Sequence, residues 1–141
     1  MYLLQLLLPL YDNAGGSELL LSVQSYRDLK VWQIAVELAL ESYRRTSRFP
    51  ADERYGLASQ IRRAATAVAA NIAEGHGRAY RREYAYHLSV ARGSVMEVEV
   101  HFLIAERLNY VASAELELLR EYCDAASRML TNLQRSLKRG T

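Results

Sequence analysis

Cysteine and proline are scarce in this sequence, and neither sign of charge dominates it. The single cysteine, Cys123, excludes an internal disulfide framework and cannot by itself build a cysteine-based zinc site. The two prolines leave long stretches that are free to form helix. The 18 basic side chains exceed the 16 acidic ones by only two, which gives little support to a histone-like, strongly basic binder. We therefore expect a helical protein in a reducing, cytoplasmic setting.

Long apolar runs are also absent. Met1–Leu10 and Leu19–Leu21 are rich in leucine, but neither approaches the ~20 apolar residues that a membrane span needs. A secretory signal places basic residues before its apolar run, whereas the first basic residue here is Arg27. We expect residues 1–24 to form a poorly ordered extension and residues 25–141 to form one domain, with no membrane partner.

Apolar residues are abundant, and their spacing is helical. They make up 50% of the chain, which excludes a disordered polyampholyte and allows a hydrophobic core. After Ser25 they recur at three- and four-residue steps, the spacing of one buried helix face. Four such stripes with short connections predict an all-α protein, an antiparallel up-down-up-down four-helix bundle. The predicted core positions are Leu29, Trp32, Val36, Ala39, Leu40 and Tyr43; Leu57, Ile61, Ala64, Ala65, Val68 and Ile72; Tyr84, Leu88, Ala91, Val95, Val98, Phe102 and Ala105; and Leu116, Leu119, Cys123, Ala126, Leu130, Leu133 and Leu137.

Local residue types predict where the four helices begin and end. Short polar side chains favour helix starts, the residue before a proline leaves the helical region, and glycine favours a left-handed stop. The first helix is expected to begin with a cap at Asp28 and to stop at Phe49-Pro50. The second should have Asp52 and Glu53 in its first turn and a left-handed stop at Gly75. The third should run from about Ala79 to Leu108, and after a break at Asn109 the fourth should begin with a cap at Ser113.

A second apolar stripe lies behind the predicted core stripe on the first and third helices. An isolated bundle would carry mostly Lys and Glu there, so the stripes favour contacts between subunits of a closed ring. Gly93 fits this prediction, because a mid-helix glycine costs about 1 kcal/mol relative to alanine and a close helix contact would compensate. The alternative is scattered surface hydrophobes, which are normal one at a time. The predicted interface residues are Val31, Ile34, Leu38, Tyr86, Gly93, Met96, Val100 and Ile104.

The arginines are concentrated in the middle of the chain. From Arg54 to Arg92 there are seven arginines and two glutamates, a net charge of +5 that leaves −3 for the remainder. Guanidinium groups bind phosphate through paired hydrogen bonds, and neighbouring tyrosines can stack on bases. The alternative is a solvated face whose arginines pair with nearby glutamates. The predicted nucleic-acid-binding residues are Arg62, Arg63, Arg78, Arg81, Arg82 and Arg92, on the second and third helices.

Signatures of catalysis are missing. The di-metal site of a ferritin-like bundle needs Glu-x-x-His pairs, and none includes His76, His87 or His101. The sequence has no phosphate-cradling glycine loop, and Cys123 lies on a core stripe without an evident base. We expect no catalytic residue, no metal and no cofactor.

Asn71, Glu74 and Gly75 are expected to form a structural motif. Asn71 lies at the edge of a core stripe and should form a hydrogen bond across helices. A carboxylate near a helix C-terminus opposes the helix dipole, so Glu74 should accept N–H groups of the next helix or pair with an arginine.

Several short motifs between about Tyr26 and Leu137 occur in a distinctive order. They are Asp28-Leu29-Lys30-Val31-Trp32-Gln33, Phe49-Pro50, Gln60-Ile61-Arg62-Arg63-Ala64, Asn71-Ile72-Ala73-Glu74-Gly75, and Ala91-Arg92-Gly93-Ser94 with Glu97. Together they resemble the four-helix bundle family known as 23S rRNA intervening-sequence proteins. The resemblance implies a small bacterial cytoplasmic bundle that assembles as a homopentamer and has no established catalytic activity.

The family name reflects gene location, because some members are encoded within insertions in ribosomal RNA genes. A related bundle, the accessory protein of diversity-generating retroelements, is a pentamer that binds nucleic acid and a reverse transcriptase. We therefore expect a non-enzymatic homo-oligomer that binds RNA or DNA, with structured RNA favoured. The alternative is a protein-interaction scaffold for a polymerase-type partner, without direct contact to nucleic acid.

Overall fold

The computed structural model describes residues 24–139, which form four long helices and no strand. The long helices are α3 (Lys30–Thr46), α4 (Leu57–His76), α5 (Arg81–Arg107) and α6 (Ser113–Arg139), and two short 3-10 helices, η1 (Tyr26–Asp28) and η2 (Ala51–Glu53), flank α3. The all-α class is confirmed. The expected extension lies, apart from Gln24, outside the described residues.

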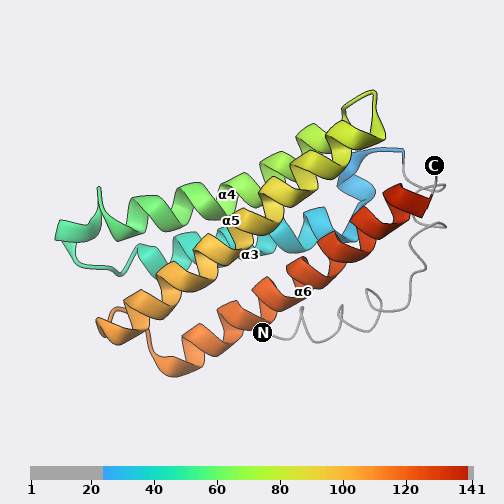
Figure 1. Ribbon diagram of the computed structural model, residues 1–141. Coiled ribbons are helices and arrows are strands. Elements are labelled where there is room, and N and C mark those ends of the chain that lie inside the picture. Colours follow the sequence, from blue (N-terminus) through green and yellow to red (C-terminus); the bar gives the residue numbers. More distant parts are fainter. Residues whose placement is uncertain (1–23, 140–141) are drawn as a thin grey trace.

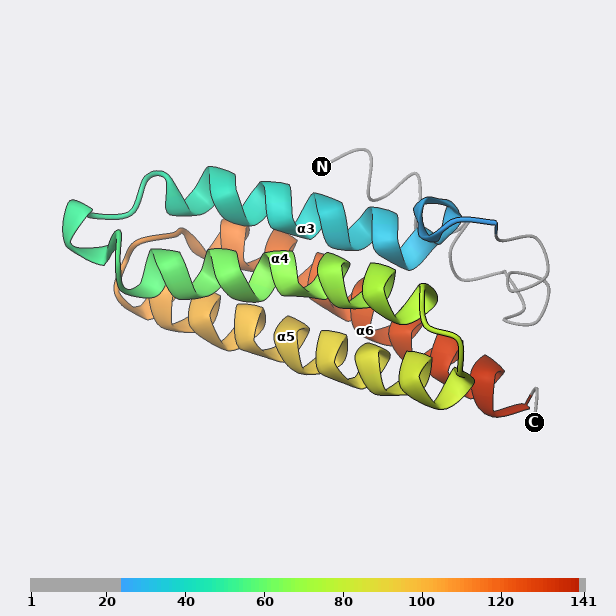
Figure 2. The same cartoon turned by 90° about the horizontal axis from the view of Figure 1, so that it is seen from above.

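The four long helices lie side by side along a common long axis (Figures 1 and 2). Each helix packs against the next one along the chain, and α3 also packs against α6. This arrangement encloses one hydrophobic core. None of the helices in the described range is long and apolar enough to cross a membrane.

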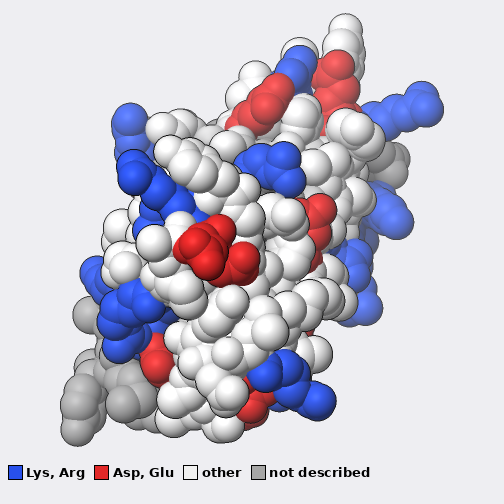
Figure 3. Space-filling model, turned by 90° about the vertical axis from the view of Figure 1, so that its left-hand side faces the viewer, with Lys and Arg blue, Asp and Glu red and all other residues white. Residues whose placement is uncertain are grey.

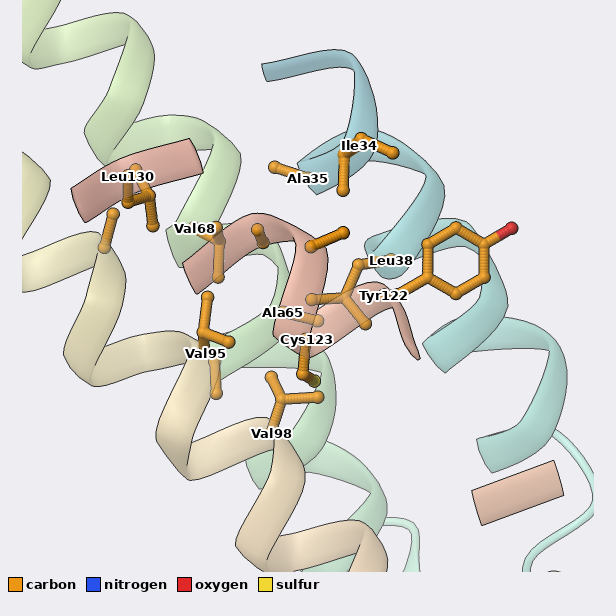
Figure 4. Close-up of a cluster of buried hydrophobic side chains, with 14 of the residues drawn as sticks. Ile34, Ala35, Leu38, Ala65, Val68, Val95, Val98, Tyr122, Cys123 and Leu130 are labelled. Atoms are coloured by element: carbon orange, nitrogen blue, oxygen red, sulfur yellow. The ribbon is translucent and has the colours of Figure 1, made fainter. Parts of the chain in front are cut away.

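Three of the four predicted core stripes are confirmed. Every predicted core position of α5 and α6 is buried, as is every one of α4 except Leu57, which is half-buried. The largest fully enclosed side chain is Phe102 of α5. Figure 4 shows how Val68, Val95, Val98 and Leu130 meet in the space between their helices.

The predicted stripe of α3 is wrong except in part, because the core takes another side of this helix. Leu29 is buried as predicted, and Trp32 and Ala39 are partly buried against the core. Val31, Ile34 and Leu38, which were expected on an outer interface, are buried in the chain's own core, and Figure 4 shows Ile34 and Leu38 pointing between the helices. Leu40 and Tyr43, which were expected inside, are 43% and 45% exposed. Both sides of α3 are apolar, so the period alone does not choose between them.

Polar residues on the buried side of α3 made that stripe hard to recognise. It continues through Ser42 and Thr46, which are both buried. Each hydroxyl donates a 2.7 Å hydrogen bond to the carbonyl four residues earlier, Ser42 to Leu38 and Thr46 to Ser42. A buried hydroxyl that finds such a partner is tolerated in a core.

Two helix starts differ from the expectation. Asp28 closes η1 rather than capping α3, since its carboxylate accepts the backbone N–H of Ser25 at 3.1 Å. Asp52 and Glu53 lie in η2, and α4 begins only at Leu57, after the chain bends at Gly56 (φ −107°, ψ −117°).

The α5–α6 connection follows the expectation more closely. Asn109 adopts a left-handed conformation with φ 63° and ends α5. Ser113 is the first residue of α6 rather than its cap, and Glu115 accepts the N–H of Ala112 at 3.2 Å.

Candidate nucleic-acid interface

Arg78 and Arg82 share a surface cavity where α4 connects to α5. The cavity has a volume of about 440 Å³, and the remaining lining residues are Glu83, Tyr86 and His87. Arg78 forms an ion pair with Glu74 at 2.5 Å. Arg82 is exposed and has no ion-pair partner in the described part of the chain. Its guanidinium group is therefore available to an anion, and the exposed ring of Tyr86 lies in the same cavity.

Asn71 fixes the orientation of His87 at the back of this cavity. The Asn71 amide nitrogen donates to the carbonyl of Ala67 at 2.9 Å, which turns its oxygen toward His87. That oxygen lies 3.2 Å from Nδ1 of His87, so Nδ1 is the donor. Nε2 of His87 lies 3.8 Å from the Glu74 carboxylate. The expected hydrogen bond of Asn71 across helices is confirmed, and so is the pairing of Glu74 with an arginine.

Gly75 brings α4 and α5 into close contact but does not stop the helix as expected. No glycine among the described residues has a positive φ, and α4 continues to His76 with Gly77 as its cap. A β-carbon on Gly75 would lie 2.8 Å from Cβ of His87 and 2.9 Å from Cδ2 of Tyr84. The missing side chain therefore permits the packing that holds His87 in place.

The other four predicted arginines do not join this cavity. Arg62 lies on the α3 side of α4, where Nε donates to Thr46 at 2.9 Å. Arg92 lies on the α6 side of α5, within 3.3 Å of Gln134, so the structure separates it from Arg62. Arg81 donates to the carbonyl of Leu137 at 3.5 Å, and Arg63 is exposed on α4.

Because the arginines lie on different sides of the helices, the positive charge of the surface is split into separate groups. At the end of the bundle that carries the α3–α4 connection, Lys and Arg side chains form several separate groups with acidic groups between them (Figure 3). The described residues thus offer local basic sites on this face, and no continuous basic strip.

The outer side of α5 is apolar and exposed, as expected. Tyr86 is 66%, Met96 56%, Val100 49% and Ile104 43% exposed. A β-carbon on Gly93 would have no other atom within 4 Å. Nothing in the described chain therefore explains a glycine at this position.

Two further members of this stripe were missed by the sequence analysis. Val90 and Leu108 are exposed as well. Val90 continues the three- and four-residue steps through Tyr86, Gly93, Met96, Val100 and Ile104, which is the signal that identifies it.

Burial suppresses the acid–base chemistry of two core side chains. It raises the pKa of the Cys123 thiol from 9.0 to about 12, with Glu99 and Asp124 adding to the effect. It also raises the pKa of Tyr84 from 10.0 to about 12. Cys123 is therefore protonated and unreactive at neutral pH. No group of three or more metal-ligating side chains occurs within residues 24–139.

Comparison with known proteins places these features in a family. A family model described as 23S rRNA-intervening sequence protein matches residues 27–132, which include all of α3, α4 and α5 and most of α6. A search of curated proteins finds no match to the chain. Since the family model spans well over half of the sequence, the chain belongs to the 23S rRNA-intervening sequence protein family.

Proposed function

We propose that this protein is a non-catalytic, ring-forming homo-oligomer of antiparallel bundles that binds structured RNA in the bacterial cytoplasm. The observation that carries the proposal is the cavity shared by Arg78 and Arg82, with the exposed ring of Tyr86 beside them. Membership of a family named for ribosomal RNA intervening sequences is consistent with an RNA-related role.

The chemistry of this cavity suits the unpaired parts of an RNA. The guanidinium of Arg82 can donate paired hydrogen bonds to a phosphate, and Arg78 adds positive charge beside it. The exposed rings of Tyr80 and Tyr86 offer stacking surfaces for bases in loops and bulges. A ring would repeat the site in each subunit and thereby raise the avidity for a folded RNA.

The apolar side of α5 supports assembly. In an isolated chain its apolar stripe is exposed to solvent, and an exposed apolar stripe usually marks a surface that binds a partner. Gly93 lies within it, where a missing side chain allows another helix to approach closely. The pentameric state is carried over from the family resemblance.

The RNA proposal is tested with the double variant Arg78→Gln/Arg82→Gln. We expect it to weaken binding of a hairpin RNA and to reduce the slope of log affinity against log salt by about two, because two phosphate contacts are lost. Arg128→Gln removes an exposed arginine of α6 and should leave both quantities almost unchanged. Equal affinities for the double variant and the wild type would contradict the proposal.

A protein scaffold is the second candidate, and the same α5 stripe favours it. A polymerase-type partner could cover Met96, Val100 and Ile104 in place of another copy of the chain. Affinity purification from native cells, with nuclease treatment before elution, separates the two. Nucleic acid that is protected from nuclease supports RNA binding, whereas a nuclease-resistant protein partner without nucleic acid supports the scaffold.

A further inference from the structure

A second basic cavity lies at the other end of α4, between the end of α3 and the connection that carries η2. Its volume of about 410 Å³ is in the range of small-molecule sites. Since α4 has 20 residues, this cavity is roughly 30 Å along the helix from Arg78. The lining residues are Thr46, Ser47, Phe49, Pro50, Ala51, Arg54, Ala58 and Arg62.

This cavity is distinguished by its charge. Two guanidinium groups line it, and no carboxylate does. The cavity at Arg78 contains Glu83, and a third cavity, between α3 and α6, contains Glu41 and Glu115. Glu53, the acidic residue before Arg54, does not line the cavity. Its carboxylate lies beside Gly56 instead, where Oε1 is 3.2 Å from the position that a β-carbon on Gly56 would occupy.

Arg62 is held in place before any ligand arrives. Its Nε donates to Thr46 Oγ1 at 2.9 Å, and its guanidinium carbon lies 4.7 Å from the centre of the Tyr43 ring. Within the described chain its two terminal nitrogens have no hydrogen-bond or ion-pair partner. These nitrogens form the planar fork that binds a phosphate group, and its orientation is already fixed.

Arg54 supplies the second charge and an aromatic neighbour. Its guanidinium carbon lies 5.6 Å from the centre of the Tyr55 ring, and Tyr55 is 88% exposed. Two cations match the charge of roughly −1.5 to −2 that a phosphate monoester carries at pH 7. The Tyr55 ring offers a base a stacking surface beside the cavity.

We propose that this cavity binds the phosphate monoester of a nucleotide, either a free nucleoside monophosphate or the phosphorylated end of an RNA strand. Arg54 and Arg62 hold the phosphate, and the wall of Pro50 and Ala51 faces the remainder of the nucleotide. The inference does not depend on RNA binding at Arg78 and Arg82, because no residue is shared between the two cavities.

Calorimetric titration of the full chain with adenosine monophosphate, and with adenosine as the probe lacking phosphate, tests the proposal. We expect the monophosphate to bind and adenosine not to bind. Arg54→Gln and Arg62→Gln should each weaken binding roughly ten- to hundredfold, as expected when hydrogen bonds to a charged group are lost. The matched control is Arg63→Gln, an exposed arginine outside the cavity, which should bind normally. Equal binding of the two probes, or equal losses at Arg62 and Arg63, would overturn the proposal.

Because Arg62→Gln also removes the contacts to Thr46 and Tyr43, a second variant keeps the test independent of folding. Ala51→Glu places a carboxylate in the wall at an exposed position and leaves those contacts intact. Melting should be unchanged while affinity for the monophosphate falls at least tenfold, by charge repulsion. Unchanged affinity in this variant would overturn the proposal.

Strands of RNA with and without a 5′-phosphate distinguish the two sources of the monoester. Tighter binding of the phosphorylated strand, lost in Ala51→Glu, identifies an RNA end, and equal binding identifies the free nucleotide. If RNA binds through Arg78 and Arg82 while the monophosphate does not bind, this inference fails and the proposed function stands. If the monophosphate binds and RNA does not, the proposed function fails alone.

Discussion

Gly75 of α4 lies so close to His87 of α5 that a β-carbon on the glycine would be 2.8 Å from Cβ of the histidine. The same β-carbon would be 3.3 Å from the backbone oxygen of Tyr84, which cannot move without shifting α5. The contact joins the Asn71–Gly75 motif to the residues that line the Arg78 cavity. It explains a glycine inside a helix, where alanine would otherwise be favoured by about 1 kcal/mol.

We therefore expect Gly75→Ala to destabilise the fold by about 1–3 kcal/mol, the usual cost of overpacking. Gly77→Ala is the matched control, because its β-carbon would meet only backbone oxygens at 3.6 Å and beyond. Urea denaturation of the two variants measures the difference. Equal stabilities would show that the α4–α5 contact can relax freely.

Tyr84→Phe should leave the stability unchanged or raise it by up to about 1 kcal/mol. The Tyr84 hydroxyl is buried and has no hydrogen-bond partner among the described residues. Removing an unsatisfied buried hydroxyl removes a desolvation cost. Denaturation at neutral pH measures the effect, and a loss greater than about 1 kcal/mol would contradict the absence of a partner.

Alkaline pH should destabilise the protein. The folded state keeps Cys123 and Tyr84 protonated up to a pKa of about 12, whereas the unfolded chain releases these protons from about pH 9 and 10. The contribution of these two groups to the free energy of unfolding is therefore fully present below about pH 9 and is lost as the pH rises toward 12. Melting temperatures between pH 7 and 11 should fall less steeply in Cys123→Ala than in the wild type. Parallel profiles would assign the alkaline loss to other groups.

Asn71→Ala should cost more stability than Glu74→Gln. Asn71 holds Nδ1 of the largely buried His87 at 3.2 Å, so its removal leaves a buried donor unpaired, at a cost of about 1–3 kcal/mol. The Glu74–Arg78 pair is about half exposed on both sides, and such pairs contribute about 0.2–1 kcal/mol. Chemical denaturation ranks the two variants. The reverse order would mean that the ion pair, rather than the amide, anchors His87.

The sequence was sufficient for the cores of α5 and α6 because the buried stripe of each helix runs through apolar residues without a polar interruption. It was insufficient for α3, where the buried stripe includes the polar residues Ser42 and Thr46, while the apolar residues Leu40 and Tyr43 lie on an exposed side. A serine or threonine can be buried when its hydroxyl donates a hydrogen bond to a backbone carbonyl. Whether it does so depends on the side-chain conformation, and the spacing of apolar residues carries no information about that conformation.

The sequence was sufficient to predict that arginines form the candidate site. It was not sufficient to predict which of these arginines lie together in the folded chain. Arg78 and Arg82 are only four residues apart in the sequence, Arg78 in the connection after α4 and Arg82 in the first turn of α5, which brings them close together. The partners of Arg62 and Arg92 depend on which neighbouring helix each side chain reaches, and that depends on helix rotation and packing. Gly75 was recognised as important, but its role lies in a contact with a distant segment.

Light scattering of the purified protein tests most directly whether the exposed stripe of α5 joins copies of the chain, as we propose. For a chain of 16.0 kDa at micromolar concentration, the account predicts a mass several times larger, five times in the proposed ring. Val100→Glu should reduce the mass to that of one chain with its helices intact by circular dichroism, while Asn132→Glu on α6 should not. A wild-type mass of 16.0 kDa under these conditions would contradict the account.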